Sequence, residues 1–108
     1  MKKFDESYIM LEDMYNDGLF PDFLVDKVKA EIEKVIALLE NGETDKEKIQ
    51  EALDEMTLAI NDLEEEFEEN DSEIETVARD SIGETVEYIL AFFGIDIDTE
   101  EAIREREW

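Results

Sequence analysis

The stretch TDKEKIQEALDEMTLAINDLEEEF, residues 44–67, decides the fold class. Its apolar residues recur at alternating spacings of four and three, which keeps them on one face of an α-helix that packs against a neighbour. These residues are Ile49, Leu53, Met56, Ile60, Leu63 and Phe67. Thr44 and Glu47 open the stretch as a capping box, in which each side chain satisfies a backbone N–H at the helix start. The pattern predicts one long amphipathic helix, which ends at Asn70-Asp71.

Two helices are expected before this stretch. The first runs from about Asp5 to Asp17, and Gly18 follows it, because glycine tolerates the left-handed conformation of a helix C-cap. The second begins after Pro21, which suits a first helical turn because its missing N–H would be unpaired there anyway. This second helix is expected to end at about Asn41.

Two further helices are expected after the central stretch. Ser72 and Glu75 form a second capping box, and Gly94 stops the helix that follows it. Gly83 lies inside that helix, where it indicates either a close contact between two helices or a kink. A last short helix begins at about Asp98.

The expected fold class is all-α. The connections between the helices are short, which favours antiparallel neighbours, and each apolar seam covers one side of its helix. The architecture predicted from these features is a four-helix bundle or a close variant of one, with a short C-terminal helix. Residues 1–108 are expected to form a single acidic domain.

The composition excludes several kinds of site. The chain has neither Cys nor His, which removes thiol catalysis, Cys/His zinc sites and Ser–His triads. The net charge of −24 argues against direct binding of nucleic acid or of an anionic membrane. No apolar signal region follows the basic start, and no apolar run has the roughly 20 residues of a membrane span. We therefore expect a cytoplasmic protein with no cofactor and no membrane contact.

Two longer strings carry a resemblance to a known family. They are MYNDGLFPDFLVDKVK, residues 14–29, and FEENDSEIETVAR, residues 67–79, together with the closing REW of residues 106–108. With them the chain resembles a family of small acidic bacterial proteins of unknown function. The resemblance implies a bacterial, helical, single-domain protein, and it supplies no catalytic residues.

The distribution of charge is the most informative feature for function. Between Ile49 and Ala78 the chain carries twelve acidic residues and no Lys or Arg. Glutamates at the negative end of a helix, and like charges four residues apart, destabilise that helix, so local stability does not explain the run. The expected docking face for a basic partner consists of Glu64, Glu65, Glu68, Glu69, Asp71 and Glu73.

The acidic run has a simpler explanation and a functional one. It is either a solvated face that only keeps the protein soluble, or a docking surface for a basic protein, as in small acidic immunity proteins. Mimicry of nucleic acid is a narrower form of the second explanation, and the break at Asn70-Asp71 weakens it by folding the line of charge back on itself. On the docking hypothesis the protein is not an enzyme, and its oligomeric state stays open.

A divalent-metal-dependent hydrolase is the alternative function. Some helical pyrophosphatases hold magnesium with carboxylates three or four residues apart, and the candidate ligands here are Glu51, Asp54 and Glu55. In a chain this acidic, such spacings also arise by chance. Residues 96–100 begin like an EF-hand calcium loop, but the glycine at the sixth position of such a loop is missing.

The aromatic residues are expected mainly in the core. Tyr8, Tyr15, Phe20 and Phe23 surround the first predicted turn, where an exposed binding patch is the alternative. Trp108 is expected to fold back onto the helices, with a contact to another molecule as its alternative.

Overall fold

The computed structural model describes residues 2–108 and contains five helices. They are α1 (Glu12–Asn16), α2 (Asp22–Glu40), α3 (Lys46–Glu69), α4 (Thr76–Phe92) and α5 (Thr99–Ala102). These residues contain no strand, which confirms the expected all-helical class. None of the helices in this part of the chain combines the length and the apolar character that a bilayer crossing requires.

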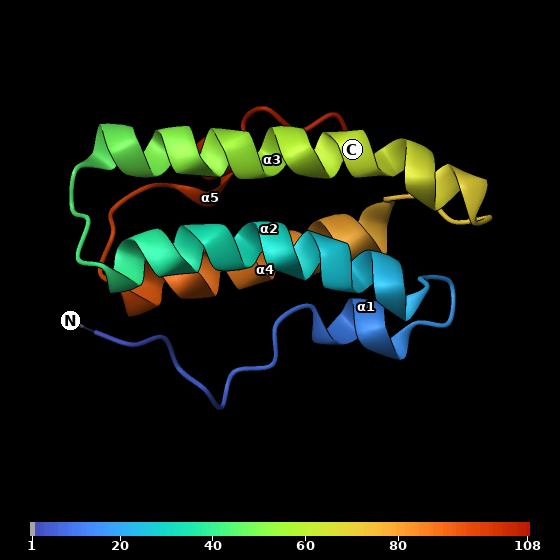
Figure 1. Cartoon of the computed structure of the whole chain (residues 1–108), viewed down its shortest axis with the longest axis horizontal. Helices are drawn as coiled ribbons and strands as arrows, with labels where there is room; N and C mark the ends of the chain where they lie inside the picture. The colour runs from blue at the N-terminus through green and yellow to red at the C-terminus, as the bar shows by residue number, and fades with distance from the viewer. Residues whose placement is uncertain (1) are drawn as a thin grey trace.

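Three long helices form the body of the molecule (Figure 1). α2 and α3 lie side by side and run in opposite directions, joined by the short connection 41–45. α1 packs against α4, and α5 contacts both α3 and α4. Side chains of the three long helices meet at the centre, among them Ile32 from α2, Leu53 from α3 and Val86 from α4. The buried apolar side chains form one continuous cluster.

The first helix is much shorter than predicted. Residues 2–10 contain turns but no helix, and Leu11 precedes α1 with a left-handed φ of 58°. Aromatic packing on α4 explains the difference. The ring of Phe4 lies edge-on to Tyr88 with centroids 5.9 Å apart, and Tyr8 stacks on Tyr88 at 3.9 Å. These tertiary contacts override the helical periodicity of the segment.

The three long helices end in the same way. After each of them, one residue adopts a left-handed conformation. Its N–H and the N–H of the following residue donate to carbonyls of the last turn, which is a Schellman motif. The left-handed residue is Gly42 after α2 (φ 92°), Asp71 after α3 (φ 57°) and Gly94 after α4 (φ 69°). The predicted helix stops at these positions are confirmed.

The two predicted capping boxes are wrong. The N-cap of α3 is Asp45 instead of Thr44, and the Asp45 carboxylate accepts a hydrogen bond from the backbone N–H of Glu47 at 2.9 Å. α4 begins at Thr76, later than predicted, with no side-chain cap. The backbone N–H of Ser72 instead closes the end of α3, so residues 72–75 form an irregular connection outside the helix.

Three expectations about single residues have different outcomes. Trp108 is only 8% exposed and belongs to the core cluster, which confirms that it folds back. Phe20 is buried, whereas Phe23 is 48% exposed. Phe23 precedes the first buried residue of α2, Leu24, and therefore lies outside the buried face of the helix. The close helix contact expected at Gly83 is not formed, since a Cβ at this position would meet no atom of the described chain within 4 Å.

Candidate functional site

The six carboxylates expected to form a docking face lie at one end of the molecule. Four belong to the last two turns of α3, and the other two lie in the connection to α4. The connection between α1 and α2 lies at the same end (Figure 1). Five of the six are exposed, and Glu64 is half-buried. We call these residues the acidic end: Glu64, Glu65, Glu68, Glu69, Asp71 and Glu73.

Local structure brings the acidic end together. At 3.6 residues per turn, the four glutamates of α3 fall within an arc of roughly 140° on one side of the helix. The Schellman turn then reverses the chain: Ser72 N donates to Phe67 O at 2.9 Å, and Asp71 N donates to Glu68 O at 3.1 Å. This turn places Asp71 directly after the glutamates of the helix and leads into the segment that carries Glu73.

The acidic end carries no compensating charge. Within residues 2–108, none of its six carboxylates forms an ion pair. Glu66, in the same turn of α3, is bound by Lys27 of α2, so a cation is available nearby and pairs elsewhere. The negative charge of the acidic end is therefore open to an incoming cation.

Glu64 shows the electrostatic cost of this arrangement. Partial burial raises the pKa of its carboxyl group, and the negative charges of Glu107 and Glu68 raise the pKa further. All three effects disfavour the ionised form.

The three candidate metal ligands are not brought together as a site. Asp54 is bound by Arg104, with Nη2 2.8 Å from Oδ2, and by the side-chain amide of Gln50 at 2.9 Å. Burial raises the pKa of Asp54, but these hydrogen bonds and the charge of Arg104 lower it more, so the pKa lies below its usual range. Glu51 and Glu55 are exposed. In the described chain, no three carboxylates are grouped in a way that would hold a metal ion.

The segment that resembles a calcium loop is also engaged in other contacts. Asp96 lies 3.8 Å from Lys46, and Asp98 caps α5 by accepting a hydrogen bond from the backbone N–H of Glu100 at 3.2 Å. These two side chains fix the position of the chain before α5 instead of converging on a common point.

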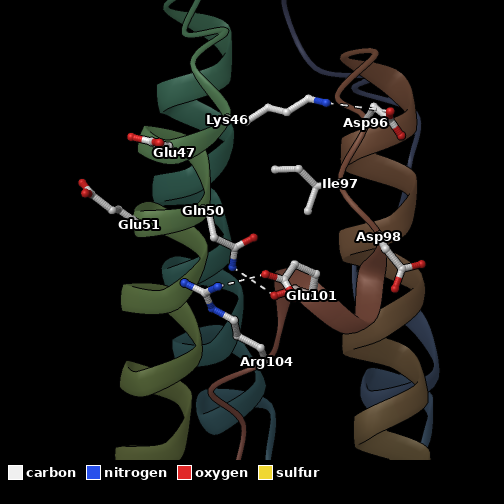
Figure 2. A pocket seen from close by; sticks show the side chains of 9 residues that line it. All are labelled: Lys46, Glu47, Gln50, Glu51, Asp96, Ile97, Asp98, Glu101 and Arg104. Atoms are coloured by element: carbon white, nitrogen blue, oxygen red, sulfur yellow. Dashed lines mark hydrogen bonds and ion pairs between the residues drawn. The ribbon is translucent and has the colours of Figure 1, made fainter.

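A groove that sequence reasoning missed lies between the first turns of α3 and residues 96–104 (Figure 2). It is open to solvent, has a volume of about 560 Å³, and contains both signs of charge. Its two cations, Lys46 and Arg104, are already paired with Asp96 and with Asp54 and Glu101. The groove is net negative, because five acidic side chains line it against these two cations. The pairs Lys46–Asp96 and Arg104–Asp54 each join residues 50 positions apart, so no local pattern in the sequence indicated them.

A C-terminal strap, residues 99–108, covers the side of α3 that leads to the acidic end. Gln50 Nε2 donates to the carbonyl of Glu101 at 3.0 Å. Asn61 bonds the strap at two points: its Nδ2 donates to the carbonyl of Glu105 at 2.8 Å, and its Oδ1 accepts from the N–H of Glu107 at 3.0 Å. With Arg104 on Asp54, these contacts engage Gln50, Asp54 and Asn61 of α3.

Comparison with known proteins gives one match. The model of a family described as a family of unknown function (DUF5713) matches residues 4–108, nearly the whole chain. No curated protein and no solved structure matches the chain.

Proposed function

The chain belongs to this family of unknown function, so its role has to be argued from its own residues, and we propose that it is a non-enzymatic protein-interaction module. On this proposal the acidic end binds a basic surface of another protein, in the cytoplasm. The family itself contributes no residue roles to the argument.

The observation that carries the proposal is the concentration of unpaired carboxylates at one end of α3. Two other acidic side chains of this helix have cationic partners: Asp54 has Arg104, and Glu66 has Lys27. The acidic end has none within residues 2–108, although the chain contains ten Lys and Arg residues. Clustered charge of one sign accelerates encounter with a partner of opposite charge and disfavours other partners.

Asp71 gives independent support. It occupies the left-handed position that glycine occupies after α2 and after α4. A side chain in this conformation costs free energy that glycine avoids, even though aspartate tolerates it better than most residues. A carboxylate at this position is therefore kept against the local preference of the backbone, as expected for a residue selected for binding.

The test compares two charge variants of equal size. Glu65→Gln/Glu69→Gln removes two charges from the acidic end, and Glu84→Gln/Glu87→Gln removes two exposed charges from α4. Each variant and the unchanged protein are used as bait in an extract of the native host, and the bound proteins are eluted with salt and identified. We expect a basic protein that the unchanged bait and the α4 variant retain and that the acidic-end variant loses.

The stability of the same variants completes the test. Removing the like-charge pair Glu65/Glu69 from the negative end of α3 is expected to stabilise the isolated domain by about 0.5–1 kcal/mol in urea unfolding. The proposal is wrong if both variants retain the same proteins, because the charge then acts only as a solvated face. A loss of stability in the acidic-end variant also contradicts it, since these carboxylates would then have stabilising partners within the fold.

A further inference from the structure

A hollow beside the acidic end combines apolar and acidic surface. It lies where the connection between α1 and α2 meets the connection between α3 and α4 (Figure 1), and its volume is about 360 Å³. Its lining residues are Leu19, Asp71, Ser72, Glu73 and Glu75. Two of the carboxylates on its wall, Asp71 and Glu73, belong to the acidic end.

Leu19 is held on the surface by a defined turn. Its backbone N–H donates to Oδ1 of Asp17 at 3.0 Å, and the N–H of Phe20 donates to the carbonyl of Asp17 at 3.2 Å. Phe20 is 3% exposed and packs edge-on against Phe67 of α3, with ring centroids 6.4 Å apart. The buried Phe20 anchors the turn, while Leu19 beside it stays 59% exposed.

Other exposed apolar side chains lie at the same end of the molecule. Phe23, in the first turn of α2, is 48% exposed, and Val77, in the first turn of α4, is 38% exposed. With Leu19, they are three of the five large apolar side chains that are exposed in the described chain. Exposed apolar side chains gathered in one region and bordered by charge are typical of an interaction site.

We propose that this hollow receives one large apolar side chain of a basic segment of another protein, whose neighbouring Lys or Arg residues contact Asp71 and Glu73. The inference rests on the proposed function and adds an apolar anchor to it. Charge complementarity selects the occupant. A second copy of this chain, with its net charge of −24, would be repelled, and so would an anionic membrane surface.

Two matched peptides test the anchor. One is a nine-residue peptide of Lys and Arg with a single central Leu, and the other carries Ser in place of that Leu. Their affinities for the protein are measured by fluorescence anisotropy at low and at physiological salt. We expect the Leu peptide to bind about tenfold more tightly, because burial of a leucine side chain contributes free energy of that order.

Two protein variants locate the effect. Leu19→Ser is expected to abolish the difference between the peptides and to leave the affinity for the Ser peptide unchanged. Ile9→Ser is the matched control, because Ile9 is 62% exposed and lies outside the lining of the hollow. This control is expected to keep the full difference. Glu65→Gln/Glu69→Gln is expected to weaken both peptides equally.

The outcomes separate this inference from the proposed function. If the two peptides bind with equal affinity, the apolar anchor is overturned. If Glu65→Gln/Glu69→Gln nevertheless weakens both peptides, the acidic docking surface stands. A Leu preference that survives Leu19→Ser overturns the anchor as well, because the apolar contact then lies elsewhere. Binding of neither peptide at low salt overturns the acidic surface and the anchor together. Self-association of the unchanged protein, lost in Leu19→Ser, identifies a second copy as the occupant and contradicts the proposal.

Discussion

Asp54 in the first half of α3 and Glu64 in its second half lie in opposite electrostatic surroundings. In the first half, Asp54 is held by Arg104 and Gln50, and the C-terminal strap covers the helix up to Asn61. In the last two turns, the acidic end has no ion pair within residues 2–108. The pKa values follow this division: the pKa of Asp54 is lowered, and that of Glu64 is raised.

This difference shows that acidic residues of one helix can lie in different electrostatic environments. The strap brings the cation Arg104 to Asp54 in the first half of the helix, so this carboxylate contributes to the fold. It stops short of compensating the second half and adds another negative charge there, Glu107, next to Glu64. An unpaired cluster that the fold does not neutralise is therefore the better candidate for binding.

Removing the anchor of the strap should have the largest effect. Trp108 is buried in the core cluster beyond the contacts that Asn61 makes with the strap. Trp108→Ala is expected to destabilise the protein by about 3–5 kcal/mol, the usual cost of deleting a buried aromatic side chain. Since it is the only tryptophan, unfolding in urea is followed by circular dichroism.

Trp108→Phe serves as the control for this prediction. It keeps an aromatic ring in the core and removes an indole N–H that has no hydrogen-bond partner in the described chain. We expect Trp108→Phe to lower the free energy of unfolding by less than about 1.5 kcal/mol. If Trp108→Ala costs no more than Trp108→Phe, the strap is not anchored in the core by Trp108, and the contact of Arg104 with Asp54 does not depend on it.

A smaller effect is expected at the turn that ends α3. Asp71→Gly should stabilise the protein by about 0.5–1 kcal/mol, because glycine adopts φ 57° without the steric cost of a Cβ. The reverse change at the end of α2, Gly42→Asp, should destabilise it by a similar amount. Urea unfolding at one ionic strength measures both. A destabilised Asp71→Gly variant would mean that the Asp71 side chain supports the turn, and its value as a sign of binding would be lost.

Much of the fold could be predicted from local patterns. The period of the apolar residues and the stops at Gly42, Asp71 and Gly94 located three long helices, because both signals depend on neighbours in the sequence. The family resemblance carried by residues 14–29 and 67–79 is confirmed as well. The first helix was overestimated, because the contacts of Phe4 and Tyr8 with Tyr88 join residues about 80 positions apart.

The site was predictable only in part. The position of the acidic end in the last turns of α3 and the connection to α4 follows from local helix and turn patterns, whereas its role as a docking face stays a prediction. The pairing of Asp54 with Arg104 could not be predicted, since it depends on the path of the strap across α3. The exposure of Phe23 matches the alternative and not the expected place in the core, because aromatic residues beside the turn were assigned to the core by type, and no expectation was made for Leu19.

The sharpest test of the comparison changes one carboxylate in each half of α3. Because the folded-state pKa of Glu64 is raised, the folded protein binds a proton more readily than the unfolded chain, and stability falls as pH rises through that pKa. Glu64→Gln should therefore stabilise the protein at pH 7 by about 0.2–0.5 kcal/mol, the size of one like-charge helix pair, and this gain should disappear below the ordinary pKa of glutamate.

Asp54→Asn should do the opposite: it destabilises the protein at pH 7. Its cost should shrink as pH falls through the lowered pKa of Asp54, because the carboxylate then loses its charge in the unchanged protein as well. Urea unfolding from pH 3 to pH 8 gives both differences. Two variants with pH profiles of the same sign would show that Asp54 and Glu64 share one electrostatic environment, and the distinction between a paired and an unpaired carboxylate on α3 would fail.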